Sequence, residues 1–315
     1  MHIPDMMLQG TICPATAAVA TIGLAGTAYA AYKTKIKPAA SYFAGVTALI
    51  FAAQMANFPI QFDTSGHLLG ATLAVALLGS AFGIMAMSLV VITQCFVFAD
   101  GGVSVLGANL LNVALLASIP AVFVRECFAS TSFQKTAYCI AAFVSVIIAA
   151  AACAAELAMT GIAPLQNVLP VMIYVHGWIG LAEAGLTVVL FIVLTQTIAQ
   201  VAPHRAWIVP LGFAAAVALM VSPFATTSPD GLEWVAGTLG CTCSQGACVL
   251  HTFGVVGCTC AHGACMLHLS APLAGYAVSA VTLATLSTAL AGFIGVVLLF
   301  TIAYGMGRVL IRSDQ

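Results

Sequence analysis

Two short segments of this chain carry nitrogen atoms that could close around one metal ion. The chain begins Met1-His2-Ile3-Pro4-Asp5, and a second segment reads Thr64-Ser65-Gly66-His67-Leu68-Leu69-Gly70. A free amino terminus, the amide of His2 and the His2 imidazole form fused chelate rings on one short peptide, and His67 adds a fourth nitrogen. Four nitrogens in a plane suit Ni(II) or Cu(II), and Co(II) accepts them. We therefore expect a square-planar metal site formed by Met1, His2 and His67.

Both histidines also have ordinary structural explanations. His2 could be a mobile terminal residue and His67 a histidine that caps a helix, as isolated histidines often are. The chelate further requires that Met1 is retained with a free amine, and a bulky second residue such as His2 disfavours its removal. Ala28-Tyr29-Ala30 resembles a signal-peptide cleavage site, but no Lys or Arg precedes Lys33, so we expect no cleavage there.

The elements that must position these segments are strongly apolar. Hydrophobic residues make up 62% of the chain and charged residues only 5%, with a mean hydropathy of +1.13, and these values exclude a soluble domain. Apolar stretches cover residues 11–32, 39–56, 67–80, 82–99, 103–124, 136–159, 170–201, 206–223 and 276–307. Since about 20 helical residues cross a bilayer, we expect an all-α, polytopic transmembrane bundle of about nine helices. The third and fourth stretches are short and join through Gly79 to Gly83.

All basic residues fall on one side of this nine-helix arrangement. They are Lys33, Lys35, Lys37, Arg125, Lys135, Arg205, Arg308 and Arg312. The loops of the other side carry Asp5, Asp63, Asp100, Asp230 and Glu233, and they carry no Lys or Arg. The positive-inside rule then places the amino terminus outside and the carboxyl terminus inside the cell membrane. Both metal-binding segments would thus reach the outer surface, where an incoming metal ion arrives.

Several motifs occur together in an order that resembles one known family. Besides the two metal-binding segments, they are Asp100-Gly101-Gly102, Gly107-Ala108-Asn109 with Asn112, and His176 followed by Gly180-Leu181-Ala182-Glu183. Together they resemble the cobalt/nickel substrate-capture subunit (CbiM/NikM type) of energy-coupling-factor (ECF) transporters. The sequence Ser228-Pro229-Asp230-Gly231-Leu232-Glu233 and the last helix resemble an accessory part (PDGLE, CbiN or NikN-like) that members often carry fused. We expect a metal-capture domain over residues 1–203 and a fused accessory part with two transmembrane helices over residues 204–315.

The resemblance implies supporting roles for polar residues inside the bilayer. Glu183 lies in mid-helix with His176 two turns earlier on the same face, and this stretch resembles the second shell that holds the metal-binding loop. Asn109 and Asn112, one turn apart on a neighbouring helix, are expected to orient His67. The alternative is that these four side chains only form hydrogen bonds between helices, with no role in metal binding.

An internal duplication lies between the last two expected helices and has no counterpart in the family. Residues 240–251 recur as residues 257–268, with nine of twelve positions identical, and each copy has the pattern Cys-x-Cys-x4-Cys-x2-His. The candidate ligands are Cys241, Cys243, Cys248, His251, Cys258, Cys260, His262, Cys265 and His268. Metal binding, as many as three disulfides in an oxidising compartment, and a functionally silent expansion are all open. If this loop harvests or senses metal for the main site, its deletion will change uptake at low metal concentration.

The chain has no motif for ATP hydrolysis, since none of its lysines follows a glycine-rich phosphate loop. The resemblance therefore implies a non-enzymatic subunit without an intrinsic cofactor, which takes Co²⁺ or Ni²⁺ as cargo. Its expected partners are a transmembrane coupling subunit, a pair of cytoplasmic ATPases and the lipid bilayer, with no nucleic acid. A membrane metal sensor or storage protein is the alternative. A membrane metalloenzyme is the weakest hypothesis, because the sequence has no His-Glu-x-x-His motif.

Overall fold

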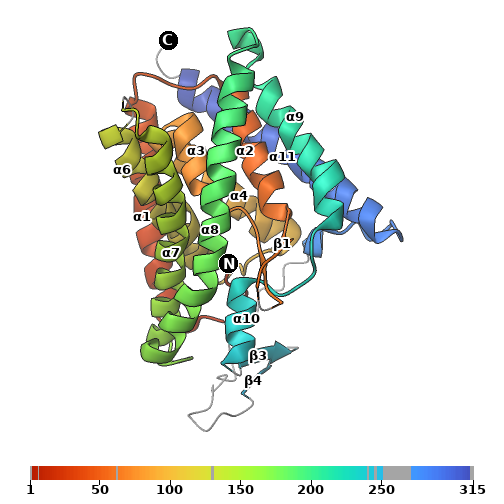
Figure 1. Cartoon of the computed structure of the whole chain (residues 1–315). Helices are drawn as coiled ribbons and strands as arrows, with labels where there is room; N and C mark the ends of the chain where they lie inside the picture. The colour runs from red at the N-terminus through yellow and green to blue at the C-terminus, as the bar shows by residue number, and fades with distance from the viewer. Residues whose placement is uncertain are drawn as a thin grey trace.

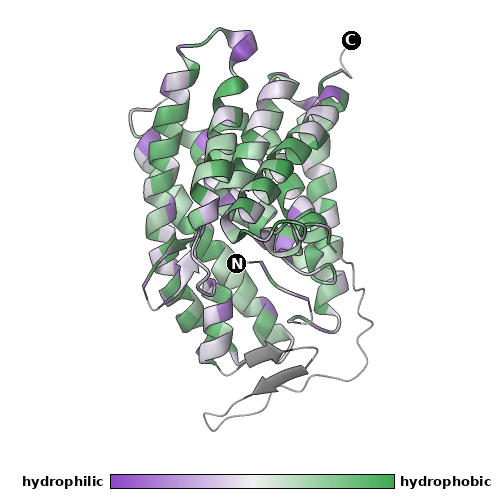
Figure 2. Ribbon diagram, turned by 90° about the vertical axis from the view of Figure 1, so that its right-hand side faces the viewer, coloured by the Kyte–Doolittle hydropathy of each residue, from purple (hydrophilic) through white to green (hydrophobic). Residues whose placement is uncertain are grey.

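The computed structural model describes residues 2–5, 7–61, 63–128, 131–239 and 271–312, and the backbone alone of residues 241–244 and 247–250. Long helices run up and down the molecule, and the carboxyl terminus lies at the end opposite the β3–β4 hairpin (Figure 1). Green, hydrophobic residues cover most of the length of these helices (Figure 2). This architecture confirms the predicted all-α, polytopic helix bundle.

The described helices and strands follow one another in this order. They are α1 (Ile12–Lys33), α2 (Ala40–Met55), β1 (Phe58–Pro59), β2 (Ser65–Gly66), α3 (Ala71–Leu78), α4 (Ser80–Thr93), η1 (Gln94–Phe98), α5 (Leu106–Asn109), η2 (Leu110–Leu115), η3 (Leu116–Ser118), α6 (Ile119–Phe128), α7 (Gln134–Met159), α8 (Leu165–Ile198), η4 (Pro203–Arg205), α9 (Ile208–Ala216), η5 (Val217–Val221), η6 (Ser222–Phe224), α10 (Gly231–Thr238), β3 (Cys241–Ser244), β4 (Ala247–Leu250), η7 (Ala274–Tyr276) and α11 (Ala284–Arg312). The segments η1, η2 and η5 are π-helical turns that continue α4, α5 and α9.

Seven helices of the described chain are long and apolar enough to cross a membrane. The apolar helix α2 is shorter, with 16 residues. The stretch 67–80 was expected to be one helix, and this expectation was wrong about its length, because α3 covers only eight residues (Ala71–Leu78). Gly70 and Gly79, with φ of 81° and 88°, bound α3 on its two sides. A hydropathy profile cannot show these positive φ values, which favour glycine.

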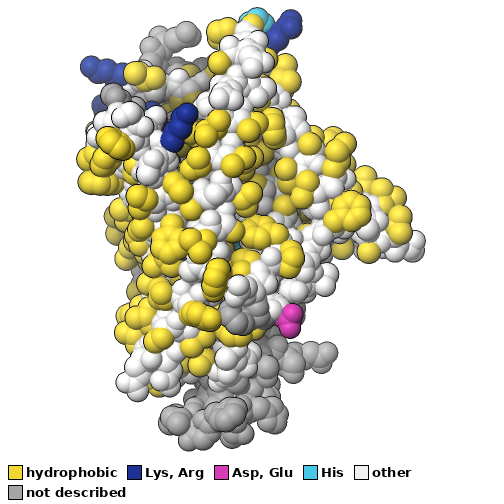
Figure 3. All heavy atoms as spheres, viewed as in Figure 1, with side chains coloured by type: hydrophobic (Ala, Val, Ile, Leu, Met, Phe, Trp, Pro, Cys, Tyr) yellow, Lys and Arg dark blue, Asp and Glu magenta, His cyan; other side chains and the backbone are white. Residues whose placement is uncertain are grey.

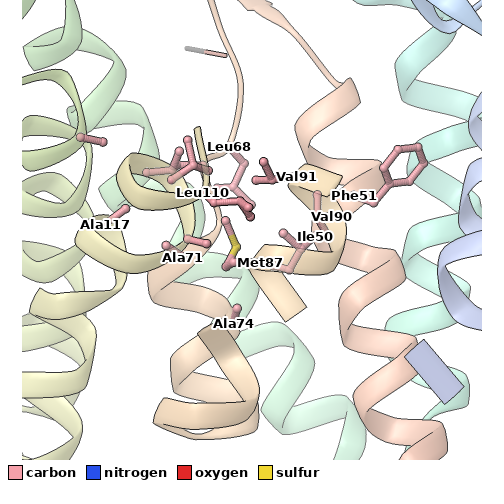
Figure 4. Close-up of a cluster of buried hydrophobic side chains, with 14 of the residues drawn as sticks. Ile50, Phe51, Leu68, Ala71, Ala74, Met87, Val90, Val91, Leu110 and Ala117 are labelled. Atoms are coloured by element: carbon pink, nitrogen blue, oxygen red, sulfur yellow. The ribbon is translucent and has the colours of Figure 1, made fainter. Parts of the chain in front are cut away.

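The helices α3 and α4 lie back to back across this break. A side chain added at Gly83 would meet the Cα of Val75 at 2.6 Å, so the two backbones touch through a glycine. Side chains from α2, α3, α4 and η2 then meet in one buried cluster that includes Ile50, Met87 and Leu110 (Figure 4). Leu68, which follows His67 directly, packs into the same cluster. The core therefore anchors the loop that carries His67.

The last helices share this core rather than forming a separate one. Both α9 and α11 pack on α2. A side chain at Gly45 of α2 would lie 2.9 Å from the carbonyl oxygen of Trp207, at the start of α9. At the carboxyl-terminal end of α11, the Lys37 Nζ donates to the carbonyl of Leu310 at 3.1 Å. The segments before and after residue 203 are therefore held side by side.

Basic side chains gather at one end of the bundle. In Figure 3 the Lys and Arg spheres lie at the upper end, and the carboxyl terminus lies at this end in Figure 1. Arg125 reaches Gly79, because a side chain added there would lie 3.3 Å from the guanidinium. The basic residues visible in this view lie on one side, as the sequence predicts, while the orientation in the membrane stays a prediction.

Candidate metal site

His2 and His67 lie face to face at the centre of the candidate site. Their ring centroids are 5.8 Å apart and the ring planes differ by 5°. His2 is buried, with 8% of its surface exposed, and His67 is partly buried. Burial lowers the pKa of His67 to about 4, so its imidazole is neutral at pH 7 and suited to bind a metal. Met1, the third expected ligand residue, lies outside the described residues.

The amino-terminal segment is fixed by hydrogen bonds to the region after α4. Asn109 Oδ1 accepts from the Ile3 amide at 2.8 Å, and Asn109 Nδ2 donates to the Ile3 carbonyl at 3.0 Å. The Gly102 amide donates to the same carbonyl at 2.9 Å. Asp5 Oδ1 accepts from both the amide and the hydroxyl of Ser104. The backbone on either side of His2 therefore has little freedom to move.

Glu183 of α8 holds the loop that carries His67 through hydrogen bonds to its backbone. Its carboxylate accepts from the Leu69 amide at 2.6 Å and from the Gly70 amide at 2.9 Å. Gln54 of α2 donates to the Leu69 carbonyl at 2.6 Å. A carboxylate that accepts two backbone amides is a strong, oriented support. Thr187, one turn further along α8, also donates to this carboxylate at 3.5 Å, so Glu183 links α8 to the buried end of the loop.

Asp100 and Tyr276 form a hydrogen-bonded chain that ends on His2. His2 Nδ1 lies 3.1 Å from Asp100 Oδ1, and the Tyr276 hydroxyl donates to Asp100 Oδ2. Burial alone would raise the pKa of Asp100, but the His2 imidazole and the hydrogen bonds more than offset it, so this pKa lies well below its usual range. Asp100 is therefore an anion beside His2. Tyr276 also stacks on Phe98, with ring centroids 4.8 Å apart.

A segment from the last third of the chain pairs with the strand just before His67. The Ser65 amide donates to the Pro229 carbonyl at 2.8 Å, and Ser65 forms a parallel bridge with Asp230. Asp230 then begins α10 with a capping box, in which its side chain and that of Glu233 bond each other's backbone amides. These bonds fix both carboxylates near the site.

His176 of α8 lies beneath this segment. Its Nδ1 bonds the Met172 carbonyl at 2.8 Å, and its ring faces Gly231, where a side chain would lie 2.9 Å from the ring. Glycine is therefore the residue that lets α10 begin over His176. Among the described residues, its Nε2 has no hydrogen-bond partner.

The two asparagines bond partners other than His67. Asn109 bonds Ile3, as described above, and Asn112 Nδ2 donates to Glu156 Oε2 at 2.7 Å. The hydrogen bonds of these two asparagines therefore lead to Ile3 and Glu156, and their expected role in orienting His67 stays a prediction. Asn109 acts on the amino-terminal segment, and Asn112 joins two helices inside the bundle.

Most of the Cys/His repeat lies outside the described residues. His251, Cys258, Cys260, His262, Cys265 and His268 belong to that part. The backbone of the first copy forms the β3–β4 hairpin, in which the Cα atoms of Cys243 and Cys248 are paired and Cys241 pairs with Leu250. The metal or disulfide state of this loop stays a prediction.

Three residues of the site had no role assigned from the sequence. Asp100 stood in a recognisable Asp-Gly-Gly motif on the acidic side, and this was the available signal. Gln54 and Tyr276 gave none, because a glutamine within an apolar helix and a tyrosine at the start of an apolar stretch are common. Their roles depend on contacts between segments that are far apart in the sequence.

Comparison with known proteins agrees with this arrangement. The family described as "Cobalt uptake substrate-specific transmembrane region" matches residues 2–201, and the PDGLE domain family matches residues 204–312. An Archaeoglobus fulgidus protein with the provisional name fused nickel transport protein NikMN is 36% identical over 190 residues, which are 59% of this chain and 63% of that protein. The match thus spans less than two thirds of that relative. The fused nickel transport protein NikMN of Rhodobacter capsulatus is 32% identical over 120 residues, 37% of this chain and 33% of that protein.

Solved structures show the same fold. A crystal structure of a transition metal transporter superposes with a TM-score of 0.56 at 27% sequence identity, covering 63% of this chain and 94% of that one. A truncated transition metal transporter gives the same TM-score and identity over 62% of this chain. The chain is accordingly a multi-pass membrane protein. It belongs to the family of cobalt uptake substrate-specific transmembrane proteins (CbiM), with a PDGLE domain fused behind that region.

Proposed function

We propose that this chain is the substrate-capture subunit of an ATP-driven ECF-type importer of nickel or cobalt. The amino-terminal amine, the His2 amide and the imidazoles of His2 and His67 hold the ion in a plane of nitrogens. The parallel pair of His2 and His67 rings, 5.8 Å apart, is the observation that supports it best. Two distant segments are fixed by separate networks so that their imidazoles meet. The transport names of the relatives point the same way.

The proposed chelate gives Asp100 a specific part. A chelate ring that joins the His2 amide nitrogen to its own imidazole uses Nδ1, the atom that contacts Asp100 in the structure. Metal capture therefore replaces the Asp100 contact with a metal bond. The Asp100 carboxylate stays beside the ion as a negative charge, and partners of this kind set the orientation and strength of metal-bound histidines.

The energy for import comes from partner proteins in this proposal. The sequence has no glycine-rich phosphate loop with a following lysine. A transmembrane coupling subunit and two cytoplasmic ATPases would bind this chain and reorient it, so that the metal is released inward. Uptake of Ni²⁺ or Co²⁺ by cells that produce all subunits should stop when the ATPase is inactivated.

Calorimetric titration with Ni²⁺ and Co²⁺ tests the site. We compare detergent-purified protein having a native amino terminus with His67→Ala and with a version extended before Met1. The native protein should bind one tight equivalent, and both variants should lose it, because each removes a nitrogen ligand. If both variants still bind one ion tightly, and blocking the thiols abolishes this binding, the main metal site is the Cys/His repeat instead.

A further inference from the structure

A cavity of about 240 Å³ opens beside the two histidines and is lined by both parts of the chain. Its lining includes His2, Gln54, Asn57, Ser65, His67, Asp100, Ser228, Asp230, Glu233 and Tyr276. The histidines come from the region matched by the cobalt-uptake family, whereas Asp230, Glu233 and Tyr276 belong to the PDGLE region. The fused part therefore forms one wall of the cavity beside His2 and His67.

The charged side chains among the described residues that line this cavity are all acidic. Asp100, Asp230 and Glu233 contribute carboxylates, and no Lys or Arg is among the described residues of the lining. Glu233 is exposed, while the side chain of Asp100 has 29% of its surface exposed deeper in the cavity. A recess with charges of one sign concentrates ions of the other sign and speeds their association. The ligand that this cavity attracts is a cation.

Two buried polar atoms of the residues that line this cavity have no hydrogen-bond partner among the described residues. These atoms are His2 Nε2 and Gln54 Oε1. His2 is 8% exposed and Gln54 is 3% exposed, so bulk water does not satisfy these atoms. Buried acceptors without a partner are rare in native proteins. A ligand whose outer surface consists of O–H donors would satisfy them, and the water shell of a divalent cation is such a surface.

Direct binding of a bare ion by the side chains does not fit this geometry. In the described part of the chain, no three His, Cys, Asp or Glu side chains are close enough together to hold a metal ion. The volume does suit an ion that keeps its water. Six water molecules at about 30 Å³ each occupy roughly 180 Å³, which is less than the cavity volume of about 240 Å³.

We infer that this cavity is a second cation site, an antechamber that binds the hydrated divalent ion before the nitrogens of the chelate replace its water. The inference rests on the proposed function, since the antechamber serves the His2 and His67 site. The carboxylates of Asp100, Asp230 and Glu233 accept hydrogen bonds from the coordinated water, as does Gln54. Any hydrated dication enters, and the nitrogens then select, because hard ions such as Mg²⁺ prefer oxygen ligands.

Stopped-flow measurement of Ni²⁺ capture tests the antechamber. The variant is Asp230→Asn with Glu233→Gln, which removes two charges, and Asn and Gln still support a capping box. The association rate at low ionic strength should fall about tenfold, while the dissociation rate and the visible spectrum of the bound Ni²⁺ stay as in the native protein. Asp63→Asn is the matched control, because Asp63 is an exposed carboxylate outside the cavity. An unchanged association rate in the double variant would overturn the inference.

Hexaamminecobalt(III) provides an independent probe. This ion does not exchange its ammonia ligands on the timescale of the experiment, so it can occupy the antechamber but not the chelate. It should slow Ni²⁺ capture by the native protein and have little effect on the double variant. Equal slowing of both proteins would overturn the inference. Failure of the proposed function looks different, because His67→Ala would then capture Ni²⁺ as well as the native protein does.

Discussion

At the scale of single residues, the site consists of two imidazoles and the groups that hold them. His2 contacts Asp100, which accepts from Tyr276, while His67 lies two and three residues before the amides that bond Glu183. Each imidazole thus depends on a carboxylate from another part of the chain. Removing such partners typically weakens metal binding by about 10–100-fold.

Tyr276→Phe tests the chain of hydrogen bonds that ends on His2. The change removes the hydroxyl that donates to Asp100 but keeps the ring that stacks on Phe98. We expect Ni²⁺ affinity to fall about tenfold, as measured by calorimetry, with no loss of folded protein. Tyr304→Phe in α11 is the control, since the Tyr304 hydroxyl accepts from Arg308 and Tyr304 does not line the cavity beside the metal site. Equal affinities of the two variants would contradict this role of Tyr276.

Glu183→Gln tests the support beneath the His67 loop. Gln has one acceptor oxygen, and its NH₂ group would face a backbone amide that also donates. The unsatisfied amide should cost about 1–3 kcal/mol of stability in the loop. We expect this cost to appear as weaker Ni²⁺ binding and a lower melting temperature. Glu126→Gln changes an exposed glutamate of α6 and should leave both quantities unchanged. If Glu183→Gln binds and melts like the native protein, the loop does not depend on this carboxylate.

At the scale of elements, close backbone contacts decide where the metal-binding segments lie. The amino-terminal segment passes over Gly102, where an added side chain would collide with Asp5. The strand β2 is paired with Pro229 and Asp230 instead of continuing into a helix. Both arrangements use backbone groups, which hydropathy and residue spacing do not report.

Gly102→Ala tests the docking of the amino-terminal segment. The added methyl group would displace Asp5 and break the bond from the Gly102 amide to Ile3. We expect Ni²⁺ affinity to fall at least tenfold while the helix content by circular dichroism stays constant. Gly26→Ala is the control, because no atom lies within 4 Å of a side chain added there. Native-like Ni²⁺ binding by Gly102→Ala would show that the segment need not dock in this way.

These contacts also explain which features could be predicted from the sequence. The long apolar stretches predict the helices. His2 and His67 are predicted as metal ligands because both carry ligand nitrogens and because the predicted topology places both on the same membrane surface. The shortness of α3 depends on positive φ at Gly70 and Gly79. The partners of Asn109 and Tyr276 depend on tertiary contacts. Such contacts leave no local pattern in the chain.

At the scale of the whole molecule, the basic side chains gather at one end. The Lys and Arg spheres of Figure 3 lie at the end where α6 and the carboxyl terminus lie in Figure 1, whereas α10 lies toward the other end. This arrangement predicts that the basic end faces the cytoplasm. The metal site would then face outward.

Thiol labelling tests the predicted orientation. In an otherwise cysteine-free background, Asp63→Cys should react with a membrane-impermeant maleimide on intact cells. The exposed thiol of Cys127 at the end of α6 should react only after the membrane is permeabilised. The reverse pattern would contradict the predicted orientation and place the antechamber on the cytoplasmic side.

Ser65 pairs with Pro229 and Asp230, which belong to the other region of the same chain. Because both regions are parts of one polypeptide, each molecule has one copy of each. Within a single chain their meeting is intramolecular, and its effective concentration is on the order of millimolar, independent of expression level. Each capture loop is therefore supplied with its own carboxylates. A separate copy of residues 204–312 added to a Glu233→Gln chain would have to displace the resident segment against this local concentration. Defects in the carboxylate wall should consequently resist rescue in trans.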